Sequence, residues 1–237
     1  MRVLTDSDFL DLWESGSRRH PLDRALLALG AAFPEDSFES LAAWPIGRRN
    51  KALIRLHCSC FGPSLRGLVS CAGCGERLEV TLDGRAVAGE GGDDAGSQGE
   101  AIDVNGEVFR MPSTQDLACV VRETDPHSAA VRLAESCRLG PAGSAAWSDG
   151  DLDEIGERMA RADPLAEIRV NLRCPECGKE QDEVLDVVEF LWAEVDSRVR
   201  RLLSDIHALA SAYGWSEAEI LSLSEGRRAL YLETLQA

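Results

Sequence analysis

The chain lacks any long apolar run. None of its 237 residues lie in a stretch that approaches the ~18 consecutive apolar residues of a transmembrane helix. Its first residues, Met1 to Asp6, turn acidic at once and contain no apolar core of a signal peptide. We therefore expect no membrane segment and a protein made in the cytosol, which either stays there or is incorporated in a larger particle.

Basic residues are also scarce. The chain has 25 Lys and Arg against 41 Asp and Glu, which gives a formal net charge of −16. This balance argues against a general binder of nucleic acid or anionic membranes, because phosphate binding requires surplus Lys and Arg. With 44% hydrophobic and 28% charged residues, the composition is that of a globular protein of one or two domains.

The short motifs of several large enzyme classes are absent too. The sequence contains no glycine-rich phosphate loop, no Gly-x-Ser-x-Gly and no His-Glu-x-x-His. Its four histidines are scattered, and its carboxylates form no recognisable acid–base pair. We therefore expect a protein that is not an enzyme and has no small-molecule substrate.

The cysteines, in contrast, are patterned. Four of the eight form two Cys-x-x-Cys-Gly units, Cys71 to Gly75 and Cys174 to Gly178. Two residues between thiolates allow a tight turn to aim both sulfurs at one tetrahedral ion, and the glycine permits the positive φ that such a turn requires. Each unit, or knuckle, leads into a short polar or alternating run that is typical of a zinc-ribbon strand.

About 100 residues separate the two knuckles, against about 15–20 in a compact four-cysteine site. We favour one structural Zn²⁺ site, split by an insertion, with four thiolate ligands: Cys71, Cys74, Cys174 and Cys177. The alternatives are two redox Cys-x-x-Cys units, two half-sites that a partner chain completes, or a site that has lost its metal. Cys119 and Cys137 lie in apolar or helical patterns and are predicted to be buried, whereas Cys58 and Cys60 stay ambiguous.

These patterns predict an α+β fold that is mostly helical. A small zinc-ribbon-like β region, split by an insertion, is flanked by N-terminal and C-terminal helical segments, with boundaries at residues 1–66, 67–184 and 185–237. The insertion is expected to hold a hairpin around Asn105-Gly106 and several helices, with flexible loops at about 84–100 and 140–150.

The strongest helical periodicity lies between Leu185 and Tyr213. Apolar residues recur there at alternating steps of three and four, which predicts one long helix with an apolar stripe that Gly214 ends. The stripe either packs on its own domain or docks on a partner. The candidate docking residues are Val188, Trp192, Val195, Val199, Leu202 and Ile206.

A second candidate surface lies on an earlier predicted helix. Residues 47–66 carry five basic side chains and no acidic one. Either this is a solvated face that balances acidic neighbours, or it docks an acidic partner through Arg48, Arg49, Lys51 and Arg55.

The last 30 or so residues carry a distinctive pattern. Ile206 to Ala210 leads to an aromatic-Gly turn at Tyr213 to Trp215, then to a capped helix with Ile220-Leu221, and finally to Arg227-Arg228 and Tyr231-Leu232. This pattern resembles the C-terminal signature of the phage T4-type baseplate hub and hub-assembly protein family, whose relatives also occur in contractile injection systems. Weaker similarities lie at Pro45 to Asn50, at Phe109 to Leu117 and at the two knuckles.

The resemblance implies a non-enzymatic baseplate or hub component, or a chaperone that assembles one. The implied partners are other baseplate, hub or spike proteins of a phage-tail-like particle. The alternative is a cytosolic zinc-ribbon adaptor that binds nucleic acid or a transcription or translation machine, using the Arg-rich segment for phosphate contacts.

Overall fold

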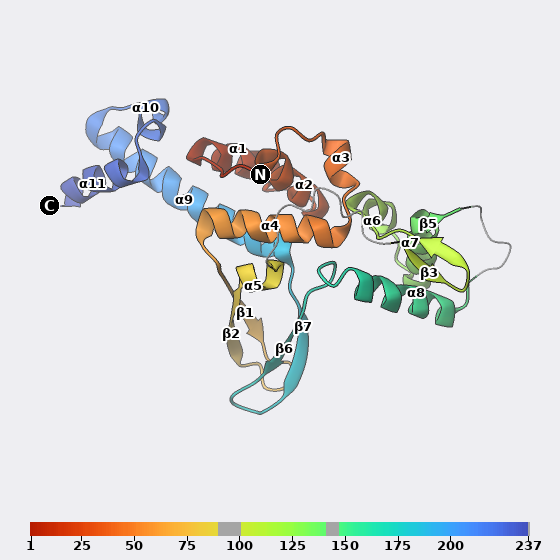
Figure 1. Cartoon of the computed structure of the whole chain (residues 1–237). Helices are drawn as coiled ribbons and strands as arrows, with labels where there is room; N and C mark the ends of the chain where they lie inside the picture. The colour runs from red at the N-terminus through yellow and green to blue at the C-terminus, as the bar shows by residue number, and fades with distance from the viewer. Residues whose placement is uncertain (90–100, 141–146, 237) are drawn as a thin grey trace.

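The computed structural model describes residues 1–89, 101–140 and 147–236. The predicted α+β fold, mostly helical with small antiparallel sheets, is confirmed (Figure 1). The molecule has three parts: a helical body (residues 1–61 and 187–236), an arm of two β-hairpins (residues 64–83 and 169–184), and an inserted unit (residues 101–163).

The helical body is built around one long helix. Its elements are α1 (Asp6–Gly16), α2 (Pro21–Ala32), α3 (Phe38–Ala42), α4 (Ile46–Phe61), α9 (Val187–Tyr213), α10 (Glu217–Leu221) and α11 (Glu225–Gln236). Local signals set several of their ends. Thr5 and Ser216 form capping boxes at the starts of α1 and α10, and Pro21 stands at the first turn of α2. Gly214 ends α9 in the left-handed conformation.

The apolar stripe of α9 is covered by the chain itself. Helices α1, α2 and α4 pack against α9, and all six candidate docking residues are buried in their common core. The interpretation that the stripe packs on its own domain is therefore correct, and the prediction that Val188, Trp192, Val195, Val199, Leu202 and Ile206 dock on a partner is wrong. The same core joins residues 1–66 to residues 185–237, so the two predicted helical segments form one body.

The C-terminal pattern also serves internal packing. Arg228 is only 4% exposed and pairs with Asp6 of α1. Arg198 of α9 binds the same carboxylate at 2.9 Å. Tyr213 stacks on Trp215 at 4.7 Å between ring centroids, and Tyr231 packs edge-on against both rings. These contacts hold α11 against the rest of the body.

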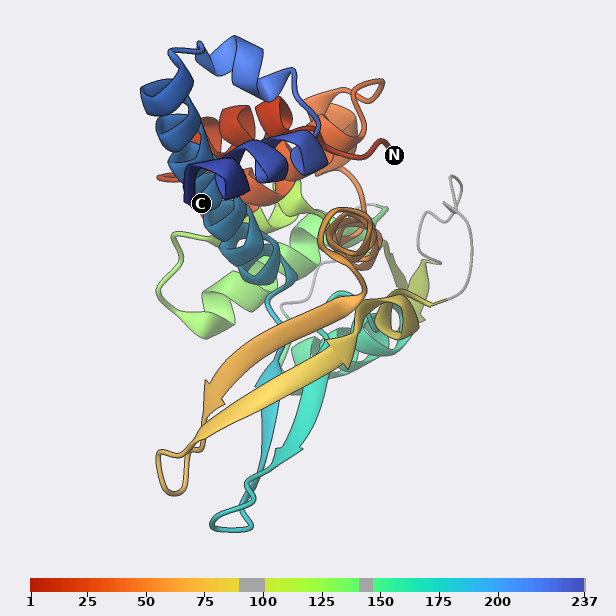
Figure 2. The same cartoon turned by 90° about the vertical axis from the view of Figure 1, so that its left-hand side faces the viewer.

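The arm projects from the body as two antiparallel hairpins that lie side by side (Figure 2). One consists of β1 (Ser64–Ser70) and β2 (Arg77–Asp83), and the other of β6 (Arg169–Arg173) and β7 (Glu180–Val184). Each knuckle is the turn of one hairpin, so both Cys-x-x-Cys units lie at the far end of the arm. The predicted zinc-ribbon-like layout is thus present, with the insertion between its two halves.

The inserted unit has a small core of its own, made by Val104, Phe109, Ala134, Cys137 and Ile155. Its elements are β3 (Ile102–Val104), β4 (Glu107–Phe109), α6 (Thr114–Val120), α7 (Pro126–Cys137), β5 (Arg138–Leu139) and α8 (Asp149–Ala162). The hairpin at Asn105-Gly106 is confirmed, both residues having positive φ. Arg138 and Leu139 do not continue α7 but pair with β4.

The predicted loop at 84–100 is partly wrong. Residues Gly84–Ala88 form the short helix α5, because Asp83 accepts a hydrogen bond from the Arg85 N–H at 2.9 Å and Ala88 is buried against α4. Residues 90–100 of this loop, and 141–146 of the other, lie outside the described residues.

Polar contacts at the start of α4 attach the inserted unit to the body. The Ile46 N–H donates to the Pro112 carbonyl at 2.9 Å, and the Gly47 N–H donates to the Asp163 carboxylate at 2.9 Å. Arg49 is only 7% exposed and donates to Thr114 Oγ1 at 3.3 Å and to Asn50 Oδ1. Two motifs far apart in the sequence, Pro45 to Asn50 and Met111 to Asp116, meet here.

The burial of Arg49 corrects its assignment to a docking surface. Arg48 lies over the Trp44 ring at 3.9 Å, and Lys51 and Arg55 are half-buried. Among the described residues, no helix combines the length and the apolar character needed to cross a membrane.

Candidate metal centre

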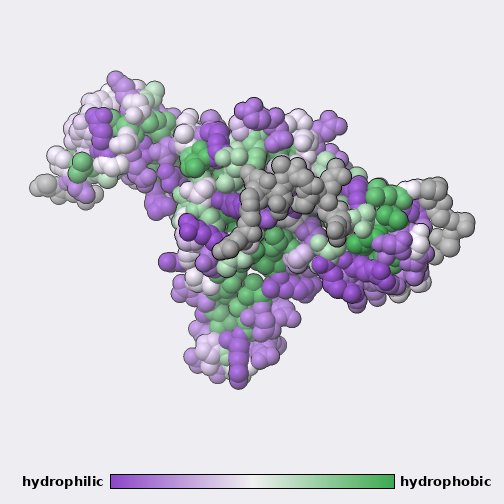
Figure 3. Space-filling view, viewed as in Figure 1, coloured by the Kyte–Doolittle hydropathy of each residue, from purple (hydrophilic) through white to green (hydrophobic). Residues whose placement is uncertain are grey.

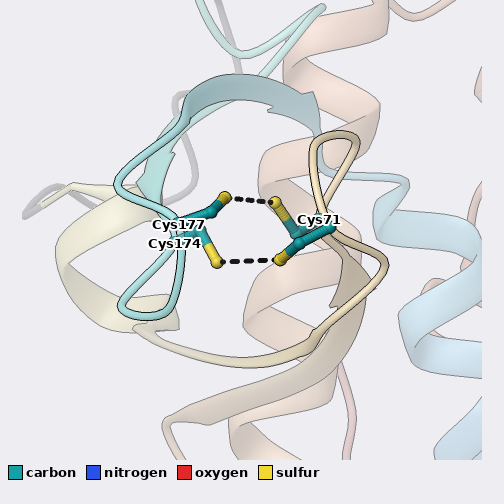
Figure 4. Close-up of side chains that lie close together, drawn as sticks. Cys71, Cys174 and Cys177 are labelled. Carbon is teal, nitrogen blue, oxygen red and sulfur yellow. Dashed lines mark hydrogen bonds between the residues drawn. The ribbon is translucent and has the colours of Figure 1, made fainter.

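Four cysteine sulfurs converge at the tip of the arm. Cys71 Sγ lies 3.6 Å from Cys177 Sγ, and Cys74 Sγ lies 3.7 Å from Cys174 Sγ. All four sulfurs lie within 4.8 Å of one another. Figure 4 shows the sulfurs of the two knuckles pointing toward one another across the gap between the hairpins. The structure thus brings together the four predicted ligands, two from each hairpin.

The two knuckles have the same backbone geometry. The Cys71 N–H donates to the Glu76 carbonyl at 2.8 Å, and the Gly75 N–H donates to the Cys71 carbonyl at 2.9 Å. In the second knuckle, the Cys174 N–H donates to the Lys179 carbonyl and the Gly178 N–H to the Cys174 carbonyl, both at 2.9 Å. Gly75 and Gly178 have φ values of 77° and 72°, so the spacing with its trailing glycine predicted the turn correctly.

The fit to a metal is tested by the distances between sulfurs. Four tetrahedral metal–sulfur bonds of about 2.3 Å place the sulfurs about 3.8 Å apart. The two sulfur–sulfur distances between the hairpins, 3.6 and 3.7 Å, match this spacing. In each knuckle the first cysteine is buried and the second exposed, so an ion here would lie near the surface with its inner side covered by protein.

The shifted pKa values of the clustered thiols also favour binding of a cation. The N–H groups of Cys74 and Gly73 stabilise the Cys71 thiolate and lower the pKa of Cys71 to about 6. At Cys74, the Glu76 N–H favours the thiolate, but the sulfurs of Cys177, Cys174 and Cys71 together with desolvation outweigh it and raise the pKa of Cys74 to about 12. Several thiolates this close together repel one another, and a bound cation removes that penalty.

A glutamine links the hairpins beside the cysteines. Gln181 of β7 accepts a hydrogen bond from the Ala72 N–H at 2.8 Å and donates to the Ser70 carbonyl at 3.2 Å. Sequence reasoning missed this residue, because one glutamine in an otherwise exposed strand carries no signal of a contact with a segment about 110 residues away. The cluster and Gln181 together determine how the two hairpins face each other.

The remaining cysteines lie elsewhere. Cys137 is buried in the core of the inserted unit, as predicted, and burial raises the pKa of its thiol. Cys119 is exposed, so the prediction that it is buried is wrong: the apolar run around it forms a short helix that packs through other residues. Cys58 and Cys60 lie on α4, packed against the core of the body and outside the cluster.

No family model matches the chain, and neither a curated protein nor a solved structure matches it either. The four-cysteine cluster is therefore the feature from which a function is argued, and its geometry is compatible with a metal site.

Proposed function

We propose that the cluster binds one Zn²⁺ ion and that this ion is structural. Tetrahedral sites made of four sulfurs are typical of zinc or iron, and the two Cys-x-x-Cys-Gly turns are those of zinc ribbons. Four thiolates fill the coordination shell and leave no position for water or substrate. The observation that carries the proposal is the convergence of four sulfurs from two distant segments.

Such an ion would hold together an arm that has little core of its own. Buried residues at its tip are Cys71, Leu78 and Cys174. Closing a loop of about 100 residues removes conformational freedom from the unfolded chain, so the bound metal adds to the stability of the folded arm.

We further propose that the protein is non-enzymatic and acts by binding other proteins, as a structural or assembly component. The particular assembly proposed is a contractile phage-tail-like particle, with the protein as a baseplate or hub component or its assembly chaperone. The support for that assembly is the resemblance of the C-terminal pattern and of Pro45 to Asn50.

The zinc-ribbon adaptor that binds nucleic acid is less favoured. Of the five basic residues in the segment 47–66 proposed for phosphate contacts, Arg49 is buried and Arg48 is stacked on Trp44. Affinity capture of tagged protein from its host at low and high salt separates the two functions. Baseplate, hub or spike proteins retained at high salt support the assembly proposal, whereas nucleic acid or ribosomal proteins released by salt contradict it.

Metal analysis tests the zinc proposal directly. The purified full chain is expected to contain one zinc ion, and Cys174→Ser is expected to lose most of it and to unfold at a lower temperature. Cys119→Ser is the matched control, since it removes an exposed cysteine outside the cluster. Iron in place of zinc, or equal zinc contents in both variants, would contradict the proposal.

A further inference from the structure

The arm and the start of α9 enclose an open apolar groove. It has a volume of about 320 Å³, and its apolar lining includes Val80 and Leu82 from one hairpin, Val170 and Leu172 from the other, and Phe190 from α9. Figure 3 shows hydrophobic surface running down the middle of the arm between hydrophilic side chains. These five side chains are only half-buried, so the part of the chain that the structure describes covers the groove incompletely.

Two strand edges border the groove. Side chains alternate between the faces of a strand, so a groove that meets only a face is lined by every second residue. The lining residues of β2 and β6 follow that rule. In contrast, four consecutive residues of β1 (66–69), and the last two residues of β7 followed by Leu185, all line the groove, so the groove meets β1 and β7 along their edges. In the described chain β1 pairs only with β2, and β7 only with β6, so each keeps one unpaired edge.

A glycine fixes one wall of the groove. A Cβ atom at Gly67 would lie 2.5 Å from Phe190 Cζ, so only glycine lets this ring rest against β1. Since Phe190 belongs to the helical body, the contact holds the middle of β1 against α9, while the cysteines and Gln181 hold the tip of the arm. One wall of the groove and its tip end are thus fixed.

The charges around the groove have one predominant sign. Glu183, Glu189 and Glu194 line it, against Arg66 alone. A complementary occupant therefore has apolar side chains for the floor and basic side chains beside them. A second copy of this chain, with its net charge of −16, is a poor match.

We infer that this groove binds an extended segment of a partner protein, which adds as a strand to an edge of the arm with its apolar side chains in the groove and Lys or Arg beside them. Strand addition uses the unpaired backbone groups for affinity and the side-chain floor for specificity. The inference deepens the proposed binding function, and it rests on the metal centre only because the metal would keep the two hairpins together.

Peptide selection tests the inference. A random display library is selected on the immobilised, zinc-loaded full chain, with the Val80→Gln variant as the counter-selection target. The expected peptides alternate apolar residues and are enriched in Lys and Arg. Peptides rich in Asp and Glu, peptides without an apolar pattern, or no enrichment over the variant would overturn the inference. Self-association of the chain through this groove would also overturn it, because the occupant would then be a second copy and not a partner protein.

Matched variants then locate the binding site of one enriched peptide. Val80→Gln is expected to weaken its affinity at least about tenfold, as at a central apolar contact, whereas Thr81→Gln on the exposed face of the same strand leaves it unchanged. Glu189→Gln with Glu194→Gln is expected to weaken binding about threefold or more, and Glu79→Gln with Glu180→Gln is the control pair outside the groove lining. Equal effects within either matched set would place the peptide elsewhere.

A chelator separates this inference from the metal proposal. If both hold, removing the metal abolishes peptide binding. Peptide binding that survives complete metal removal supports the groove and contradicts the role given to zinc. A zinc-loaded chain for which no peptide is enriched contradicts the groove and leaves the metal centre supported.

Discussion

Gly47 is the residue at which a single methyl group should matter most. It lies in the first turn of α4, where an added Cβ would collide with the Asp163 carboxylate that accepts the Gly47 N–H. We expect Gly47→Ala to lower the free energy of unfolding by about 1–3 kcal/mol, because the inserted unit must shift to make room. Urea unfolding followed by circular dichroism measures this change.

Gly156 supplies the matched control. It lies inside α8, where an added Cβ would have no heavy atom of the described residues within 4 Å apart from its chain neighbours and its own helix backbone, and its φ is not positive. Alanine there is expected to raise the free energy of unfolding by about 0.4–1 kcal/mol, because it restricts the unfolded chain and favours the helix. Similar effects of the two substitutions would show that the contact with Asp163 is unimportant.

Asp116 makes stability depend on pH. Burial alone would raise the pKa of Asp116, but hydrogen bonds from Arg110 and Ser113 outweigh burial and hold the pKa well below its usual range. A carboxyl with a lowered pKa stabilises the fold above its unfolded-state value of 3.8, and this contribution is lost as the pH falls toward the folded-state value. We therefore expect the urea midpoint to fall between about pH 5 and pH 3.

The substitution Asp116→Asn tests that assignment. It should lower stability at pH 7 and flatten the pH dependence of the urea midpoint, because the asparagine does not titrate. The exposed Asp11→Asn is the control and should change neither. A pH profile of Asp116→Asn that is parallel to that of the original chain would assign the acid sensitivity to other carboxylates.

At the scale of elements, α9 presents two leucines in opposite environments. Leu209 is fully buried in the body, whereas Leu203 is 41% exposed on the same helix. Leu209→Ala is expected to lower the free energy of unfolding by about 2–5 kcal/mol through the cavity that it leaves. Leu203→Ala is expected to change it by no more than about 0.5 kcal/mol, as at other surface positions. Equal losses in denaturant unfolding would show that the stripe of α9 is not the centre of the core.

Elements with local signals were predictable from the sequence, and those that depend on distant partners were not. The capping residues Thr5, Ser113 and Ser216 act within three residues of themselves, so the starts of α1, α6 and α10 followed from the sequence. The strand β5 exists only because Arg138 and Leu139 meet β4, and the burial of Arg49 depends on Thr114, 65 residues away. No local pattern contains that information.

The candidate metal site was predictable from the sequence for a similar reason. Each knuckle is a local turn with its own glycine, so the four cysteines were identifiable as a set despite the insertion. The orientation of the hairpins depends also on Gln181, Gly67 and Phe190, which are ordinary residues in their own strands and helix. The groove between the hairpins therefore became visible only in the folded chain.

The separation of the cores predicts that metal removal acts on one part of the molecule. The core of the body includes Phe9, Leu29, Leu53 and Val195, and among the described residues the small cluster at the arm tip shares no buried residue with it. Chelation of a zinc-loaded chain should therefore increase amide hydrogen exchange in β1, β2, β6 and β7, while α1, α2, α4 and α9 keep their protection. Hydrogen exchange with mass spectrometry measures both regions in one experiment. Loss of protection throughout the chain would mean that the arm and body unfold as one cooperative unit, and unchanged exchange in the arm would mean that the hairpins hold together without a metal.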